Sequence, residues 1–506
     1  MKDYSFETFD WHHFLSVIYH IFPVQVPARM AWSRLSEGSY QRLLGDSEFP
    51  LFIGSQNALG DMFLHLALRA PTRYFRAERV QIAWGLIRRK NPLLMSKVLV
   101  DGDDLSTARF SFSPPLTSES AVQEAAVALH WKHETKEELI STYMDGPRVL
   151  SNDYLSYLVI SEPESASDSG ETSVYHILMC APHFIGDGTA LHQSTHELLS
   201  LVSSEMTDAE LIRELDKPQN WVDLLPSSVE SRLRAPSSAF GKAACKINYL
   251  QTLSREIGGH TFSRIQRGPK RTILQECEFT ETQTRAILAN CKTNGVTVNH
   301  ALTALCNVAW TRCTSQSPKL PMMLYTAANL RPHLAPHSST SHWFLALTYF
   351  TISLPAFPPA IPSVWFRARL AKAQMQGAVR SSLLPARALL SAAARARRTP
   401  SSPSAFVPPP ESPALPTRPP ASSALLGISL IGDLDRTYVR SSYGAGVHLH
   451  SVSTASRLKP GGLLLLGHSF GGRLVLQLCW DSMGFAEGEV ERFWNALTES
   501  VPEFLC

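Results

Sequence analysis

The sequence lacks the patterns that mark metal-binding, disulfide-stabilised and glycosylated proteins. Its eight cysteines form no C-x-x-C pair and no zinc spacing. The adjacent His12 and His13 have no cysteine or carboxylate spacing that would support a site, so we expect no bound metal. No Asn-x-Ser/Thr sequon occurs. This cysteine usage predicts free thiols in a reducing compartment.

A charge excess of one sign and a membrane-spanning run are also missing. The formal net charge is only +3, and the scattered Lys and Arg give no reason to expect nucleic acid as a partner. The most apolar run, 461–479, is interrupted by Gly467, Gly471 and Gly472 and carries His468 and Arg473, so it is a poor membrane span. The polar, acidic first seven residues do not resemble a signal peptide. We therefore expect a soluble, cytoplasmic protein that works as a monomer.

The chain has enough length and apolar content for more than one core. With 506 residues, 44% of them hydrophobic, it suits two globular domains with insertions.

One short stretch combines the residues and the context of a catalytic site. Residues 181–190 read A-P-H-F-I-G-D-G-T-A, after an apolar, β-rich run at 174–180 and before helical spacing of apolar residues at 189–202. His183 should therefore lie in a strand-to-helix turn, and Asp187 should cap the helix. Gly188 would let the backbone come close to a ligand. Of the 18 histidines, only His183 has an aspartate four residues later. A structural His beside an ordinary Asp-Gly turn is the alternative.

This motif and its surroundings resemble the chloramphenicol-acetyltransferase-like superfamily of CoA-dependent acyltransferases, which includes the BAHD enzymes, fungal O-acetyltransferases and condensation domains. The resemblance implies an α/β fold of two lobes with mixed sheets and an active-site tunnel between them. It implies His183 as the general base and Asp187 as a salt-bridged orienting residue. Pro182 stands where condensation domains usually carry a second His, which favours a free-standing acyltransferase. The D-F-G-W-G motif of BAHD enzymes is absent, which leaves a plant-type placement of CoA without support.

A second stretch fits the same resemblance. Residues 321–332 read as a strand that ends in Asn-Leu-Arg-Pro. The superfamily often has an Arg here that pairs with the aspartate of the motif, and the planar guanidinium suits a carboxylate. We therefore expect Arg331 to pair with Asp187 and, with Gly188, to support the site. An ordinary exposed Arg before a proline is the alternative.

The expected organisation is an N-terminal lobe at 1–207, a crossover segment at 208–270 and a C-terminal lobe at 271–506. Within the last, residues 385–424 hold ten prolines, five Arg and one Glu, with Ala and Ser runs. That composition predicts a disordered insertion, or a retained intron or misjoined exon.

Gly467–Gly471 is a competing motif, because G-H-S-F-G fits the G-x-S-x-G nucleophile elbow of serine hydrolases with Ser469 as the nucleophile. That fold needs a His after the Ser, and none follows Ser469. The strand-like run 474–480 stands where a helix is required. We expect a hairpin instead.

Taken together, the sequence predicts transfer of an acyl group from a CoA thioester to a hydroxyl, or as a second choice an amine, of a small molecule such as a terpenoid or other secondary metabolite. Acyl-CoA would be a co-substrate, with no bound cofactor. A serine hydrolase and a non-catalytic binding relative are the alternatives.

Overall fold

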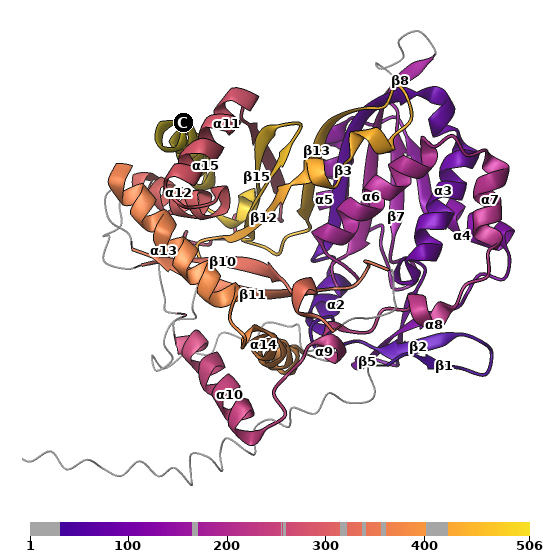
Figure 1. Cartoon of the computed structure of the whole chain (residues 1–506), viewed down its shortest axis with the longest axis horizontal. Coiled ribbons are helices and arrows are strands. Elements are labelled where there is room, and N and C mark those ends of the chain that lie inside the picture. Colours follow the sequence, from indigo (N-terminus) through magenta and orange to yellow (C-terminus); the bar gives the residue numbers. More distant parts are fainter. Residues whose placement is uncertain are drawn as a thin grey trace, which may run out of the picture.

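The chain forms two α/β lobes, each built on a mixed β-sheet (Figure 1). The computed structural model describes residues 31–163, 171–254, 256, 260–313, 321–335, 341–355, 361–400 and 424–506. His12 and His13 lie outside the described residues. No helix within the described ranges has both the length and the apolar character needed to cross a bilayer.

The first lobe is organised around a five-stranded sheet, in which alternate side chains face two different cores. Its strands run in the order β13 (His448–Ser456), β3 (Asp61–Pro71), β8 (Thr172–Pro182), β7 (Tyr157–Ser161), β6 (Leu129–Lys132). On β3 and β8, one set of alternate residues packs under α3 (Ala77–Lys90) and α6 (Gly188–Val202). The other set faces α5 (Lys136–Asp145). Both faces are buried over most of β3 and β8, which explains why these strands are mainly apolar.

Smaller elements surround this sheet. Two helices, α4 (Ser118–Val127) and α7 (Asp208–Asp216), pack outside α3. A second sheet packs beside α2 (Phe49–Gln56) and has the order β1 (Ser33–Arg34), β2 (Tyr40–Leu43), β5 (Asp104–Phe112), β4 (Lys97–Asp101).

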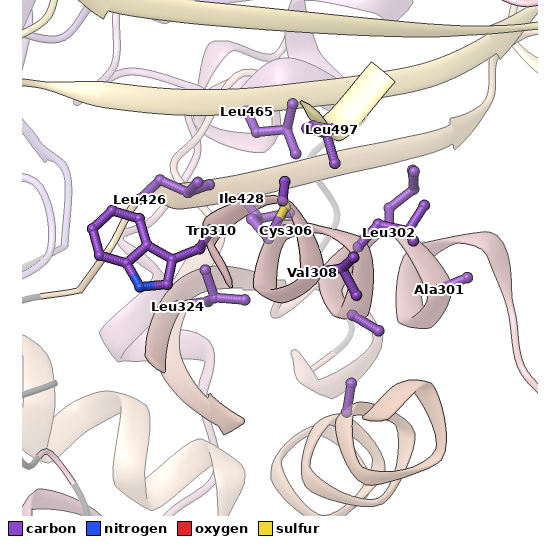
Figure 2. Close-up of a cluster of buried hydrophobic side chains, with 14 of the residues drawn as sticks. Ala301, Leu302, Cys306, Val308, Trp310, Leu324, Leu426, Ile428, Leu465 and Leu497 are labelled. Carbon is purple, nitrogen blue, oxygen red and sulfur yellow. The ribbon is translucent and has the colours of Figure 1, made fainter. Parts of the chain in front are cut away.

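The second lobe is a six-stranded sheet with helices on one face. Its order is β11 (Leu347–Leu354), β10 (Met322–Asn329), β12 (Gly427–Asp433), β14 (Leu463–Phe470), β15 (Arg473–Asp481), β9 (Thr272–Glu278). Its helices are α11 (Glu281–Thr293), α12 (Val298–Cys313), α13 (Ile361–Val379) and α15 (Glu489–Leu505). The apolar α12 is buried between α13, α15 and the sheet, where Cys306 and Trp310 meet Leu324, Ile428 and Leu497 (Figure 2).

The two lobes are interlocked, and one predicted boundary needs correction. Strand β13 comes from the C-terminal part of the chain, yet it pairs antiparallel with β3 in the first lobe. The range 271–506 is therefore not confined to one lobe, because β13, which lies late in the sequence, pairs with the outer edge of β3 in the first-lobe sheet. Leu466 of β14 and Cys479 of β15 also pack in the core under α5.

The prediction of disorder over 385–424 is wrong for its first part. Helix α14 (Leu384–Arg398) buries Leu384, Ala388 and Leu389 against Val229 and Leu233. Ala and Arg favour helix, and the leucines find apolar partners in the crossover segment, which composition alone does not reveal. Residues 401–423 lie outside the described residues. The crossover segment itself contributes α8 (Trp221–Leu224), α9 (Val229–Arg232) and α10 (Ala239–Ser254).

Candidate active site

His183 lies in the short turn between β8 and α6, as the sequence predicted. Its backbone N–H donates to the carbonyl of Gly60 at 3.1 Å. Its ring Nδ1 is 2.9 Å from the carbonyl oxygen of Gly186. A carbonyl oxygen can only accept, so this geometry assigns the proton to Nδ1 and leaves Nε2 of the neutral ring with a free lone pair. The half-buried imidazole is thus arranged as a proton acceptor.

Asp187 is the N-cap of α6 and is almost fully buried. Its Oδ1 accepts hydrogen bonds from the backbone N–H groups of Thr189 at 3.1 Å and Ala190 at 3.4 Å. Its Oδ2 accepts from Arg331 Nη1 at 2.7 Å and from the N–H of Ala346 at 3.4 Å. The predicted cap and the predicted ion pair with Arg331 are both present. Because these bonds run to α6 and to the second lobe, Asp187 holds the turn in place.

Arg331 forms the second-lobe side of the contact with Asp187. It follows β10, and its Nη2 donates to the carbonyls of His342 at 3.1 Å and Phe344 at 3.2 Å. Its guanidinium also lies 4.8 Å from the centre of the Phe344 ring. The two sides of one planar group therefore bind the first lobe's carboxylate and the second lobe's backbone.

The glycine that the turn requires is Gly186, and the sequence singled out Gly188 instead. A Cβ on Gly186 would lie 2.6 Å from Cε3 of Trp343, whereas one on Gly188 would make an ordinary 3.7 Å contact with Ile431. The close approach at Gly186 is thus to a buried side chain of the protein itself. Trp343 lies more than 150 residues after Gly186 in the sequence, so no local pattern could have indicated this contact.

Trp343 is held by a polar contact that the sequence also did not reveal. Its indole Nε1–H donates to Ser194 Oγ of α6 at 2.6 Å. The same hydroxyl lies 3.0 Å from Nε2 of His342. Burial lowers the pKa of His342 to about 4, so this imidazole stays neutral near pH 7.

Ser469 does not lie in a nucleophile elbow. It is in β14, where it pairs with Leu474 of β15 across a turn at Gly471 and Gly472. An elbow needs a strand, a turn and then a helix, so the hairpin prediction is confirmed.

The comparisons with known proteins identify the fold. No profile of a known protein family matches the sequence, and no curated protein matches it. Among solved structures, the trichothecene 15-O-acetyltransferase TRI3 of Fusarium sporotrichioides is similar with a TM-score of 0.77 and 17% identity, covering 96% of this chain and 100% of that one. The condensation domain of the monacolin K polyketide synthase MokA is similar with a TM-score of 0.59 and 11% identity, and the match covers 92% of this chain and 96% of that one. Polyketide synthase associated protein 5 of Mycobacterium tuberculosis is similar with a TM-score of 0.56 and 14% identity, and the match covers 91% of this chain and 97% of that one. The chain thus shares the two-lobed α/β fold of these proteins, with a mixed sheet in each lobe, and the predicted fold class is confirmed.

Proposed function

We propose that this protein transfers an acyl group from a CoA thioester to a hydroxyl of a small molecule, with His183 as the general base. The observation that carries the proposal is the hydrogen bond from His183 Nδ1 to the Gly186 carbonyl. That bond presents Nε2 as an acceptor on a fixed ring, at the turn where Asp187 and Arg331 join the two lobes.

In the proposed reaction, Nε2 of His183 takes the proton of the acceptor hydroxyl as its oxygen attacks the thioester carbonyl. A C–O bond forms, and the carbonyl electrons move to oxygen in a tetrahedral intermediate. The intermediate collapses with cleavage of the C–S bond, and the imidazolium returns its proton to the thiolate of CoA. The products are an ester and free CoA, and no covalent acyl-enzyme is needed. General-base catalysis of this kind contributes about 10²–10⁴-fold. Asp187 acts as a positioning residue, because its bonds hold the turn.

The acceptor class follows from similarity and is part of the proposal. The fold is shared with an enzyme named as a trichothecene O-acetyltransferase, which favours a terpenoid or other secondary metabolite and a hydroxyl over an amine. Pro182 precedes His183, which favours a free thioester over one carried by a partner protein.

The test is release of free CoA thiol from acetyl-CoA and longer acyl-CoAs, with a pool of hydroxylated metabolites as acceptors. His183→Ala should reduce acceptor-dependent release by about 10²–10⁴-fold. The matched control is His448→Ala, since His448 is exposed on β13. Acceptor-dependent release that survives His183→Ala would remove His183 from the mechanism. No release by the wild type with any donor would leave a binding protein.

A further inference from the structure

Helix α10 of the crossover segment lies at the edge of the molecule, beside α14 (Figure 1). Its inner side carries Cys245 and Tyr249, which are both buried. On the same side, Asn248 accepts a hydrogen bond from Arg387 of α14 at 3.3 Å. These contacts attach α10 to the protein and leave its other side facing solvent.

The outer side of α10 is apolar. Phe240, Ile247 and Leu250 are 86%, 42% and 45% exposed. With Ala243 they recur at intervals of three, four and three residues, which places them on one face of the helix, opposite the buried pair. Large apolar side chains that line up on an exposed surface mark a site of interaction.

The same helix is basic. Residues 231–254 contain two arginines and two lysines and no aspartate or glutamate. Arg234 and Lys242 are exposed, and Lys246 is half-buried. Lys242 and Lys246 are one turn apart, so they share one flank of the apolar face. Lysines in this position can extend their ammonium groups past an apolar surface that the helix face covers.

Helix α14 adds positive charge beside α10. Residues 380–400 contain five arginines and no acidic residue, and Arg397 and Arg398 are exposed. Burial raises the pKa of the Tyr249 hydroxyl, while the charges of Arg398 and Arg397 oppose this rise, which places both arginines near α10.

The acidic groups that face this surface offset only part of its charge. Glu256 interacts with Arg398, and Asp46 interacts with Arg397. The basic residues of the two segments outnumber these two carboxylates. The apolar face of α10 therefore lies in a positively charged part of a chain whose net charge is only +3.

The combination of the apolar face with this charge favours one occupant over the others. A second copy docked face to face would bring Lys242 and Lys246 of each chain against those of the other, and like charges at an interface are unfavourable. A nucleic acid would match the charge but would not bury a row of Phe, Ile and Leu. An anionic bilayer surface suits both features, because apolar side chains enter the acyl boundary while basic ones meet the headgroups.

We propose that α10 is a peripheral membrane-binding helix, which lies on an anionic bilayer with Phe240, Ile247 and Leu250 inserted below the headgroups. Lys242 and the arginines at the end of α14 would meet the lipid phosphates. One short amphipathic helix with basic neighbours gives reversible binding. The inference does not depend on the proposed reaction, and its test needs no turnover.

The first experiment measures cosedimentation of the full-length protein with vesicles of phosphatidylcholine alone and of equimolar phosphatidylcholine and phosphatidylserine. The wild type should prefer the mixed vesicles, and added salt should weaken its binding. Phe240→Gln and Leu250→Gln should each weaken binding roughly tenfold, because one apolar side chain no longer enters the bilayer. Lys242→Ala should weaken it roughly fivefold, as expected for one basic residue at an anionic surface.

Two variants outside this surface are the matched controls. Leu288→Gln removes a leucine of α11 that is 53% exposed. Arg213→Ala removes an arginine of α7 whose side chain is 72% exposed. Both should bind vesicles like the wild type. The replaced side chains are all exposed, so unaltered thermal unfolding should verify that every variant is folded.

The second experiment locates the contact by hydrogen–deuterium exchange. Mixed vesicles should slow the exchange of amides in α10 and at the end of α14, and leave α7 and α11 unchanged. Protection elsewhere with none in α10 would overturn the proposal.

Each other occupant of the face predicts a different result, and each of these results would overturn the proposal. Vesicle binding that Lys242→Ala weakens and both glutamine variants on α10 leave unchanged would indicate a purely electrostatic surface, as for nucleic acid. A lipid-free dimer that Phe240→Gln abolishes, without vesicle binding, would assign the face to a second copy. A monomeric wild type that binds neither kind of vesicle would mean that another part of the chain covers α10.

The outcomes also separate this inference from the proposed function. Vesicle binding that follows the variants as expected, without acyl transfer from any donor, would retain the membrane surface and reject the reaction. Acyl transfer that depends on His183, without vesicle binding, would retain the reaction and reject the membrane surface.

Discussion

At the scale of single residues, the site depends on one buried carboxylate and the groups that neutralise it. Asp187 is 2% exposed, and its hydrogen bonds come from α6 on one side and from Arg331 and Ala346 on the other. A buried carboxylate is costly unless it is paired. The same contacts that satisfy Asp187 therefore fix the turn that carries His183.

Arg331→Lys should weaken the contact between the two lobes at Asp187, although it preserves the positive charge. A lysine can reach Asp187 but cannot also donate to the two carbonyls that Arg331 binds, because its ammonium is a point charge. We expect kcat to fall at least tenfold and the free energy of unfolding to fall by about 1–3 kcal/mol, since buried acceptors lose their donors. Kinetics and urea denaturation measure the two effects.

The control for this substitution is Arg312→Lys. Arg312 makes a forked ion pair with Glu503 at the surface, with side chains 29% and 48% exposed, and such pairs contribute about 0–1 kcal/mol. Equal losses in the two variants would contradict a special role for Arg331.

Gly186→Ala should damage the site, whereas Gly188→Ala should not. The added methyl group at residue 186 would overlap the buried Trp343 ring, and the backbone would have to move together with the carbonyl that orients His183. We expect a loss of about 1–3 kcal/mol of stability from overpacking and a large loss of acyl transfer. Calorimetric melting and CoA-thiol release of both variants test this. A fully active Gly186→Ala would show that the turn tolerates the shift.

At the scale of elements, α14 connects the crossover segment to the second lobe. Leu389 is 9% exposed and packs in a small apolar cluster with Val229 and Leu233. Leu389→Ala should lower the free energy of unfolding by about 2–3 kcal/mol, near the low end for buried leucines because the cluster is small. Denaturant unfolding measures the loss. Leu288→Ala on α11, where the side chain is 53% exposed, is the control and should change stability by under about 0.5 kcal/mol. Similar values for both variants would mean that α14 is not packed in solution.

The sequence predicted those elements whose signals are local. Strand β8, the cap Asp187, helix α6 and the β14–β15 hairpin follow from periodicity, capping chemistry and glycine turns. The Arg331–Asp187 pair came from the resemblance to a family. Gly186 against Trp343 could not be predicted, because steric fit between residues far apart in the chain leaves no mark on either local sequence. The fold of α14 was missed for the same reason: its partners Val229 and Leu233 lie far from it in the sequence.

At the scale of the whole molecule, buried neutral histidines make stability depend on pH. Burial lowers the pKa of His192 in α6 to about 3 and that of His468 in β14 to about 4. In the unfolded chain both titrate near about 6.5. Between these values the unfolded state binds more protons than the folded state, so stability is fully present above about pH 6.5 and is lost as the pH falls toward 4.

The expected slope is about 2–3 kcal/mol per pH unit near pH 5 from these two groups. Urea denaturation at pH 7.5, 6 and 5 measures it. His192→Gln should flatten the dependence, while His448→Gln at an exposed position should not alter it. Equal slopes in the wild type and His192→Gln would contradict the assignment.

The pairing of β13 with β3 also has a consequence for how the protein is made. On the ribosome, β3 and β8 emerge early, yet the partner for the outer edge of β3 is translated only after most of the second lobe. For that interval the nascent first lobe presents an open strand edge, the kind of surface that promotes aggregation. Expression of residues 1–207 alone should therefore give insoluble protein, and adding residues 448–456 as a separate peptide should reduce its aggregation.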